Sequence, residues 1–310
     1  MIESTFIKSA ALTVGFDDCG IARATRLDDS EFPLERWLAE GYHADMHYME
    51  RNAEMRRDPR LLVPDARSVI SLVVAYRPDR QTEGACRTAQ YAYGEDYHER
   101  LKRMMYSLIA IIKERYADFL ARPFVDTAPI SDRHWAVRAG LGSIGRNTLF
   151  FHRRYGSYCH LCELVTTSEI DCYDMPEVKP PLCGECNRCV DACPNHAIVC
   201  LPDGAYVVDA RRCTSYNTIE NRATELPPQL DTRGYIFGCD ICQLVCPRNA
   251  NAAVALYLDD DRKAQLEGLP DMDEPSFRKF RKHTPLDRIN YQQLQRNIEH
   301  QKNEGSRSGK

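Results

Sequence analysis

Hydrophobic residues recur at helical spacing over 99–120, ERLKRMMYSLIAIIKERYADFL, which predicts an amphipathic helix. A second, shorter helix is expected around Leu34, Trp37 and Leu38. The run VISLVVAY (69–76) predicts a buried strand, and PFVDTAPI (123–130) predicts a short strand that ends in a turn. The broad face of the long helix consists of Leu101, Met104, Met105, Leu108, Ile111, Ile112 and Phe119.

These patterns divide the chain into three parts. Residues 1–177 mix helix and strand, and the proline-marked segment EVKPPL (177–182) predicts a boundary. Residues 178–250 contain most of the cysteines. Residues 251–310 predict a polar C-terminal extension in which 259–274 is acidic and 276–310 is basic. We expect its last segment, NEGSRSGK, to be disordered.

Composition narrows the class of protein. The 310 residues are 43% hydrophobic, which is enough for the cores of two domains. The net charge of −4 excludes a global polycation for non-specific nucleic-acid binding, so any basic surface must be local. The N-terminus does not resemble a secretory signal, and the longest apolar run is far too short to span a bilayer. We therefore expect a cytoplasmic protein without membrane association.

The fourteen cysteines favour metal chemistry over disulfides, because thiols stay reduced in the cytosol. In CGECNRCVDACP (183–194) four cysteines stand at spacings of two, two and three, followed by Pro194. In bacterial ferredoxins such a run gives three thiolates to one iron–sulfur cluster and its fourth to another. A second run, CDICQLVCP (239–247), provides three more cysteines and a following proline.

Two [4Fe–4S] clusters need eight thiolates, and the two runs supply seven. Cys213, in RRCTSYNTIE, is the best eighth ligand, and Cys200 is the alternative. Structural zinc is the competing interpretation, although the spacing fits cubane clusters better. The six other cysteines are expected to be packed side chains. The exchange of ligands assigns Cys183, Cys186, Cys189 and Cys246 to cluster one, and Cys193, Cys213, Cys239 and Cys242 to cluster two.

The segment AGLGSIGRN (139–147) contains a literal G-x-G-x-x-G. A dinucleotide site requires a strand before this motif and a helix after it. Here HWAVRA, before it, is helix-like and NTLFF, after it, is strand-like. The pattern therefore predicts a glycine turn rather than an NAD site, and leaves open a close backbone approach to another bulky cofactor.

A series of further segments stands in a fixed order along the chain together with the cysteine runs. They are GFDDCGIA (15–22), RWLAEGYHADMHYMERN (36–52), RRDPRLLVPDARSVI (56–70), YAYGEDYH (91–98), VDTAPISDR (125–133), AVRAGLGSIGRNTL (136–149), YGSY (155–158) and RRCTSYNTIENR (211–222). In these segments, up to about residue 250, the chain resembles the epoxyqueuosine reductases, cobalamin-dependent iron–sulfur enzymes of tRNA modification. The resemblance implies reduction of epoxyqueuosine to queuosine at the tRNA wobble position, with one cobalamin and two [4Fe–4S] clusters. It also implies an α/β (α+β) cobalamin-binding domain similar to that of reductive dehalogenases, followed by a ferredoxin-like domain and a short tail.

The same resemblance implies roles for single residues. Asp126, in VDTAP, corresponds to the proton donor, with Asp132 as the rival. To donate near neutral pH, its pKa has to be raised by a dry pocket or an electron-rich neighbour. Without the resemblance, Asp126 would be an ordinary turn aspartate. The expected cofactor-binding residues are Arg57, Asp96, Tyr97, Asp126, Arg146, Asn147 and Ser157.

Some features depart from the family or leave alternatives open. Ser143, Arg146 and Cys162 replace residues that are commonly Trp, Lys and Gly in relatives. In FRKFRKHTPLDR (277–288) the basic side chains are candidates for tRNA phosphate contacts, and Phe277 and Phe280 for anchors. We expect a monomer that receives electrons from an external low-potential donor. The alternatives are a corrinoid reductase of a small molecule and a non-catalytic electron carrier.

Overall fold

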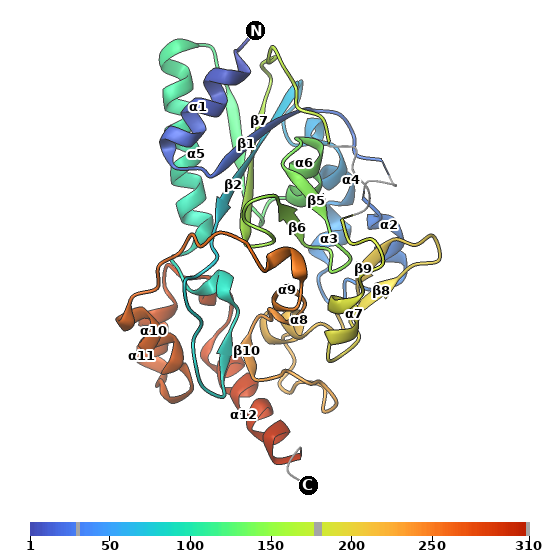
Figure 1. Ribbon diagram of the computed structural model, residues 1–310, viewed down its shortest axis with the longest axis vertical. Coiled ribbons are helices and arrows are strands. Elements are labelled where there is room, and N and C mark those ends of the chain that lie inside the picture. Colours follow the sequence, from blue (N-terminus) through green and yellow to red (C-terminus); the bar gives the residue numbers. More distant parts are fainter. Residues whose placement is uncertain (29–31, 177–181, 308–310) are drawn as a thin grey trace.

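A computed structural model describes residues 1–28, 32–176 and 182–307 (Figure 1). The N-terminal part is built on a four-stranded sheet in the order β1-β2-β7-β4, in which every neighbouring pair is antiparallel. The central strand β2 is buried along its whole length, as its apolar sequence predicts. The strands are β1 (Asp18–Arg23), β2 (Ser68–Ala75), β7 (Cys159–Thr166) and β4 (Ala121–Phe124).

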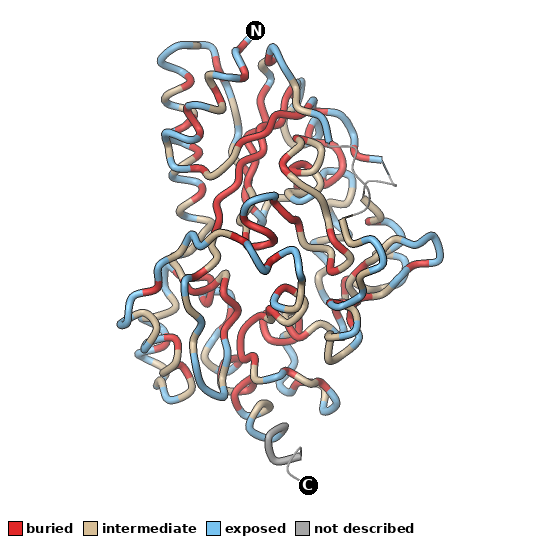
Figure 2. Tube along the Cα trace, in the orientation of Figure 1, coloured by how far each residue is buried: buried red, intermediate tan, exposed pale blue. Residues whose placement is uncertain are grey.

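Helices cover both faces of this sheet, so the buried strands lie between two hydrophobic cores (Figure 2). On one face, Ile70 and Leu72 pack with α1 (Ser4–Val14) and α5 (Tyr97–Arg115). On the other, Val69 and Val73 pack with α6 (Asp132–Arg138). This alternation follows from the two-residue period of a strand.

The long helix and the short strand are confirmed with shifted ends. Helix α5 ends at Arg115, and Phe119 is still buried although it lies beyond the helix. Strand β4 ends at Phe124, and the chain then turns through Asp126, whose φ is 38°. The helix expected near Trp37 is α2 (Leu34–Ala39).

The glycine segment has the reversed order that its flanks predict. Helix α6 precedes it, and strands β5 (Gly142–Ile144) and β6 (Phe150–His152) form a hairpin. A Cβ on Gly142 would lie 2.1 Å from the carbonyl oxygen of Phe151, so close strand packing requires glycine there. The segment therefore lacks the strand–turn–helix geometry of a dinucleotide site.

The cysteine-rich part consists of short elements that join the N-terminal part. Strand β10 pairs in parallel with β3 (Arg87–Thr88), far away in sequence. The predicted boundary at 177–181 lies outside the described residues. The elements are α7 (Arg188–Ala192), β8 (Ile198–Cys200), β9 (Tyr206–Val208), α8 (Thr214–Ile219), β10 (Tyr235–Phe237) and α9 (Ile241–Leu244).

The C-terminal extension is folded, which corrects the prediction of a mainly polar tail. Phe277, Leu294 and Ile298 are buried in a core with Phe237 of β10. Helix α12 continues to Arg307, so the disorder expected from residue 303 is wrong up to that point, and 308–310 lie outside the described residues. The helices are α10 (Asp260–Glu267), α11 (Glu274–Arg281) and α12 (Tyr291–Arg307).

The remaining elements are short. They are α3 (Tyr48–Arg51), α4 (Ala53–Arg57) and the 3₁₀ turns η1 (Pro59–Leu61), η2 (Gln90–Ala92), η3 (Pro247–Asn249), η4 (Leu269–Asp271) and η5 (Pro285–Arg288). Across the described ranges, no helix combines the length and the apolar character that crossing a membrane requires.

Candidate active site

The eight cysteines predicted as cluster ligands fall into two neighbouring groups. Burial, together with the nearby thiols Cys183 and Cys186, raises the pKa of Cys246. Burial and the nearby thiols Cys183 and Cys246 likewise raise the pKa of Cys189. In the other group, burial raises the pKa of Cys239 and of Cys242. Cys213 and Cys193 add to the rise for Cys239, and Cys239 and Cys213 add to it for Cys242. The last cysteine of each run thus lies with the opposite group, as in ferredoxins.

The spacing of these thiols fits cubane clusters better than zinc. Four thiolates on one zinc lie about 3.8 Å apart, because each Zn–S bond is about 2.3 Å long. Among the described residues, no three cysteine sulfurs lie within 4.8 Å of one another. Backbone amides also point at the sulfurs: the N–H of Ala197 donates to Sγ of Cys193 at 3.2 Å, and that of Arg146 to Sγ of Cys183 at 3.4 Å.

Cys200, the alternative eighth ligand, is not among the thiols that act on the pKa of Cys239 or Cys242 in the second group. Its side chain is exposed, and its thiol contacts the carbonyl oxygen of Leu201 at 3.5 Å. Cys213 directly precedes helix α8 and faces Cys193 and Cys239. The geometry therefore favours Cys213.

Three residues expected at the cofactor, Arg146, Asn147 and Ser157, join the N-terminal part to the cysteine runs. The Arg146 guanidinium donates to the carbonyl oxygens of Cys186 (3.0 Å) and Gly184 (2.7 Å). The amide of Asn147 donates to the carbonyl of Cys242 at 3.3 Å. The Ser157 hydroxyl donates to Oε1 of Gln243 at 2.8 Å. These contacts give Arg146, Asn147 and Ser157 an evident role in holding the cysteine-rich part.

Asp126 is the centre of a polar cluster at the end of β4. The hydroxyl of Tyr97 donates to its Oδ2 at 3.0 Å, and Nε2 of His98 lies 3.2 Å from the same oxygen. Nδ1 of His98 lies 2.8 Å from Oδ1 of Asp96, which also caps α5. His98 is thus held between two carboxylates, and the Asp126 side chain is still 61% exposed.

These contacts set the protonation states. Desolvation acts to raise the pKa of Asp126, but the hydrogen bonds from His98 and Tyr97 outweigh it, so the pKa is lowered. Desolvation acts to lower the pKa of His98, but Asp126 and Asp96 raise it. This corrects the expectation that the pKa of Asp126 is raised: the pKa of Asp126 is lowered, and that of its partner His98 is raised.

Aromatic side chains connect this cluster to the second cysteine group. Tyr97 stacks on His160, with ring centroids 4.3 Å apart, and makes an edge contact with Tyr91 at 6.2 Å. Tyr91 in turn lies 6.1 Å from Phe237, which is two residues from Cys239. The packed rings therefore run from the candidate acid to Phe237 at the end of β10, two residues before Cys239.

Both arginines of the RRDP segment are buried, and Arg56 is the one on which the charge of Asp126 acts. Arg57 is fully buried, and Nη2 lies 3.6 Å from Oε1 of Glu35. Burial lowers the pKa of Arg56, and the nearby charges of Asp132 and Asp126 act to raise it. Its Nε has no hydrogen-bond partner within the described part of the chain. Arg56 is thus a buried donor beside Asp126 that a ligand can satisfy.

Asp132, the rival to Asp126, belongs to a separate buried cluster. Ser71 and Glu163 stand opposite each other on β2 and β7, on the face that α6 covers with Asp132. Burial and the charge of Asp126 raise the pKa of Asp132 to about 6, and burial and the charge of Asp132 raise that of Glu163. One oxygen of Asp132 and both of Glu163 lack a geometrically satisfactory partner among the described residues. A shared proton relieves this cost. Glu163 is the single acidic residue in the apolar strand sequence CHLCELVT, and this feature of the sequence could have indicated the buried cluster.

We expect Glu163→Gln to change how stability depends on pH. A raised carboxyl pKa stabilises the folded state below the unfolded value of about 4.3, and this contribution is lost as pH rises through the folded pKa. Glutamine keeps the shape of the side chain and cannot ionise. The free energy of unfolding should therefore fall less between about pH 5 and pH 8 in the variant than in wild type. Urea unfolding across that range measures it. Equal slopes for both proteins would contradict a protonated Glu163.

Two family models match the chain. One, "Epoxyqueuosine reductase QueG, DUF1730", covers residues 56–127, and a "4Fe-4S double cluster binding domain" covers residues 182–249. An epoxyqueuosine reductase of Cyclobacterium marinum is 40% identical over 315 residues, which cover 98% of each chain. The chain belongs to the epoxyqueuosine reductase family.

Solved epoxyqueuosine reductases have the same fold. The enzyme from Streptococcus thermophilus matches with a TM-score of 0.82 at 30% identity, covering 95% of this chain and 79% of that one. Another matches with a TM-score of 0.79 at 27% identity, with the same two coverages, and was crystallised with an epoxyqueuosine-modified tRNA-Tyr stem loop. The predicted α/β architecture followed by a double-cluster domain is thereby confirmed.

Proposed function

We propose that this oxidoreductase reduces epoxyqueuosine in tRNA to queuosine, with Asp126 as proton donor. The observation that carries the proposal is the exposed Asp126 carboxylate, held by Tyr97 and His98 and joined by packed rings to the second cysteine group. Converting an epoxide to an alkene and water takes two electrons and two protons, and the first proton is needed when the carbon–oxygen bond opens. This site offers a proton next to a candidate electron-transfer centre.

The residues present suit the implied cofactors. The two cysteine groups offer four thiolates each, with amide donors to Cys183 and Cys193. Around Asp126, the buried Arg56 Nε lacks a partner among the described residues, and Tyr97, His98 and His160 form a stacked wall. We propose that cobalamin binds at this wall. When bound, cobalamin supplies a low-valent metal centre that opens the epoxide, and the clusters supply its electrons singly.

In this proposal the protein moves one proton from His98 through Asp126. Protonated His98 shares its Nε2 proton with Oδ2 of Asp126, and Asp96 holds the ring in place through Nδ1. The Tyr97 hydroxyl donates to the same Oδ2 and fixes the carboxylate. As the epoxide oxygen gains negative charge, Asp126 passes it the proton and His98 replaces that proton.

We expect His98→Gln to lower turnover and to shift its pH profile. Glutamine can still donate a hydrogen bond to Asp126 but holds no titratable proton. Since general acid–base groups contribute about 10²–10⁴-fold, and Asp126 remains, we expect a loss of about tenfold to a hundredfold. In the profile of kcat/KM against pH, the alkaline limb should move to lower pH. The variant lacks the imidazole of His98, whose raised pKa keeps a proton available at higher pH. An unmoved limb would assign His98 a purely structural role.

The C-terminal extension offers a surface for tRNA and supports the active site. Lys279 and Lys282 are exposed, whereas Arg281 donates to the carbonyl oxygen of Ile289 at 2.6 Å. Phe277 is buried, which fits its predicted role as an anchor. The carbonyl oxygen of His283 accepts from the N–H of Asp96 at 2.7 Å, so this segment also holds the start of α5. We propose that the two lysines contact tRNA phosphates.

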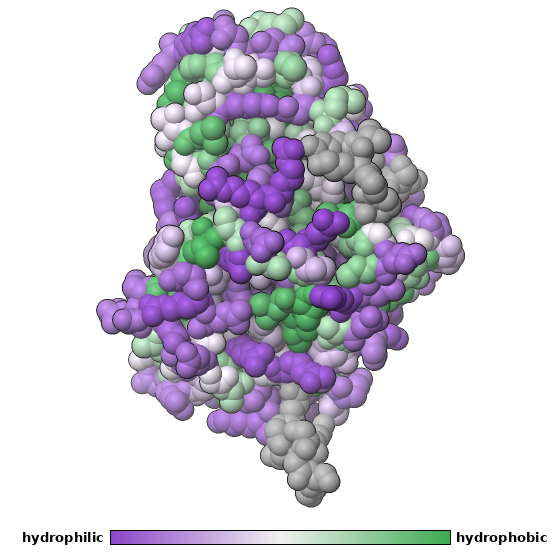
Figure 3. Space-filling model, in the orientation of Figure 1, coloured by the Kyte–Doolittle hydropathy of each residue, from purple (hydrophilic) through white to green (hydrophobic). Residues whose placement is uncertain are grey.

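An external low-potential donor would have access near the first cysteine group. A cavity of about 470 Å³ is lined by Arg77, Arg188, Leu244 and Cys246 among others. Figure 3 shows hydrophobic side chains gathered at the position of α9, where Leu244 is 37% exposed. We propose that the donor docks on this face and that the protein acts as a cytoplasmic monomer.

The test is conversion of modified tRNA by anaerobically reconstituted protein with cobalamin and a low-potential reductant. Mass spectrometry of the digested tRNA should show queuosine in place of epoxyqueuosine. Free epoxyqueuosine nucleoside is the matched control, because a small-molecule reductase would accept it equally well. Unchanged nucleoside in the tRNA, with both cofactors loaded, would reject the proposed function.

A further inference from the structure

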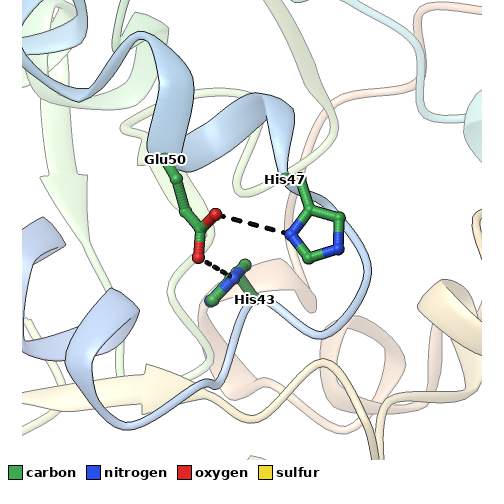
Figure 4. A group of neighbouring side chains, drawn as sticks. All are labelled: His43, His47 and Glu50. Atoms are coloured by element: carbon green, nitrogen blue, oxygen red, sulfur yellow. Dashed lines mark hydrogen bonds and ion pairs between the residues drawn. The ribbon is translucent and has the colours of Figure 1, made fainter.

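Two imidazoles and a carboxylate meet at the turn that leads into α3, apart from the cysteine groups (Figure 4). One ligand atom each from His43, His47 and Glu50 lies within 4.8 Å of the other two. Nε2 of His43 is 2.7 Å from Oε1 of Glu50, and Nδ1 of His47 is 3.4 Å from Oε2. Figure 4 shows both rings turned towards the carboxylate.

This geometry is close to what a metal ion requires. Zinc binds imidazole nitrogen and carboxylate oxygen at about 2.0–2.2 Å, so ligand atoms in a tetrahedral site lie about 3.4 Å apart. The 3.4 Å distance from Glu50 to His47 equals that value. The 2.7 Å distance from Glu50 to His43 is a hydrogen-bond distance, so this pair has to separate by roughly 0.7 Å when an ion enters between the ligand atoms.

The backbone holds these residues in place. His47 and Glu50 are three residues apart at the start of α3, which puts them on the same side of the helix. His43 is buried and packs against Trp37, with ring centroids 5.9 Å apart. Asp45, between the two histidines, accepts a hydrogen bond of 2.8 Å from the Tyr216 hydroxyl. The turn is thus fixed against the double-cluster part.

The exposed side of the cluster leaves room for a further ligand. The side chains of His47 and Glu50 are 65% and 48% exposed, whereas that of His43 is 7% exposed. Sites with three protein ligands and one open position are typical of exchangeable or catalytic metal ions. Two histidines and one carboxylate match the preference of zinc and other divalent first-row metals.

We propose that His43, His47 and Glu50 form a binding site for a divalent transition metal, best matched by zinc, with a solvent-facing fourth position. This site uses none of the cysteines and none of the side chains proposed to move the proton. It would fix the segment that carries Tyr48 and leads to Arg56, both within electrostatic range of Asp126. Metal binding therefore stabilises one wall of the candidate active site.

The experiment uses the full chain with its clusters loaded, so that the cysteines are occupied. After chelator treatment and dialysis against zinc, we expect about one zinc per chain and unchanged iron. Zinc X-ray absorption should show only nitrogen and oxygen neighbours at about 2.0–2.1 Å. His47→Gln and Glu50→Gln should each weaken zinc binding at least tenfold.

The matched control is His283→Gln. His283 also forms an exposed pair with a glutamate, at 3.0 Å from Glu99, but belongs to no three-ligand group in the described chain. This variant should bind zinc as wild type does. Sulfur neighbours at about 2.3 Å, or equal zinc affinity in wild type and His47→Gln, would overturn the proposal.

Discussion

Asp126→Asn should abolish most turnover while leaving the fold and both cysteine groups intact. Asparagine tolerates the positive φ of 38° at this position, and its side-chain oxygen can still accept from Tyr97. It cannot carry the proton that His98 supplies. A general acid contributes about 10²–10⁴-fold, or about 3–5 kcal/mol of activation free energy, so single-turnover conversion should fall by that factor.

Asp65→Asn is the matched control for this variant. Asp65 is also an exposed aspartate with a positive φ, of 60°, but lies in the turn before β2. It should keep wild-type turnover, so a loss confined to Asp126→Asn reports on chemistry rather than on the turn. Iron content and the cobalamin spectrum are measured on both proteins. Turnover within about twofold of wild type in Asp126→Asn would transfer the acid role to Asp132 or to water.

Cys213→Ser should remove one cluster and stop electron transfer. Cys213 lies with Cys193, Cys239 and Cys242, so its loss leaves three thiolates in the second group and four in the first. We expect iron and labile sulfide to fall to about half of the wild-type content, with one set of cluster signals left in the EPR spectrum. Conversion of tRNA should fall below detection, because the ring path from Asp126 leads to this group.

Cys200→Ser provides the comparison for Cys213→Ser. Cys200 is exposed and is not among the thiols that act on the pKa of Cys239 or Cys242, and should therefore be replaceable without loss of iron. Retention of the full iron content by Cys213→Ser, together with a loss in Cys200→Ser, would reverse the assignment. Full iron in both variants would mean that the second cluster has a ligand outside these cysteines.

The sequence predicted most reliably what depends on local spacing. The two cysteine runs and their exchange of ligands could be predicted because a few residues of backbone determine where each thiolate can reach. The buried strand β2 and helix α5 could be predicted because their hydrophobic period is long and regular. Asp126 was predicted as the proton donor only through the family resemblance, since nothing in the sequence around it distinguishes it from an ordinary turn aspartate.

What could not be predicted depends on contacts between distant segments. Arg146 and Asn147 follow the glycine turn, and their family motif did not show that they bind the cysteine-rich part. His98 gains importance only because β4 brings Asp126 to within 3.2 Å of it. The C-terminal extension looked like a solvated tail because its buried positions, such as Phe277 and Leu294, are far apart among charged residues.

The hydrogen bond from the Asp96 amide to the His283 carbonyl has a consequence for biosynthesis. A nascent chain released at residue 250 would contain every proposed catalytic and cluster-binding residue, yet the start of α5 would lack this partner. The parallel pairing of β10 with β3 likewise joins two segments that are far apart in the sequence and are therefore synthesised at different times. The start of α5, which carries Tyr97 and His98, therefore has its full set of partners only when the segment around His283 has folded against it.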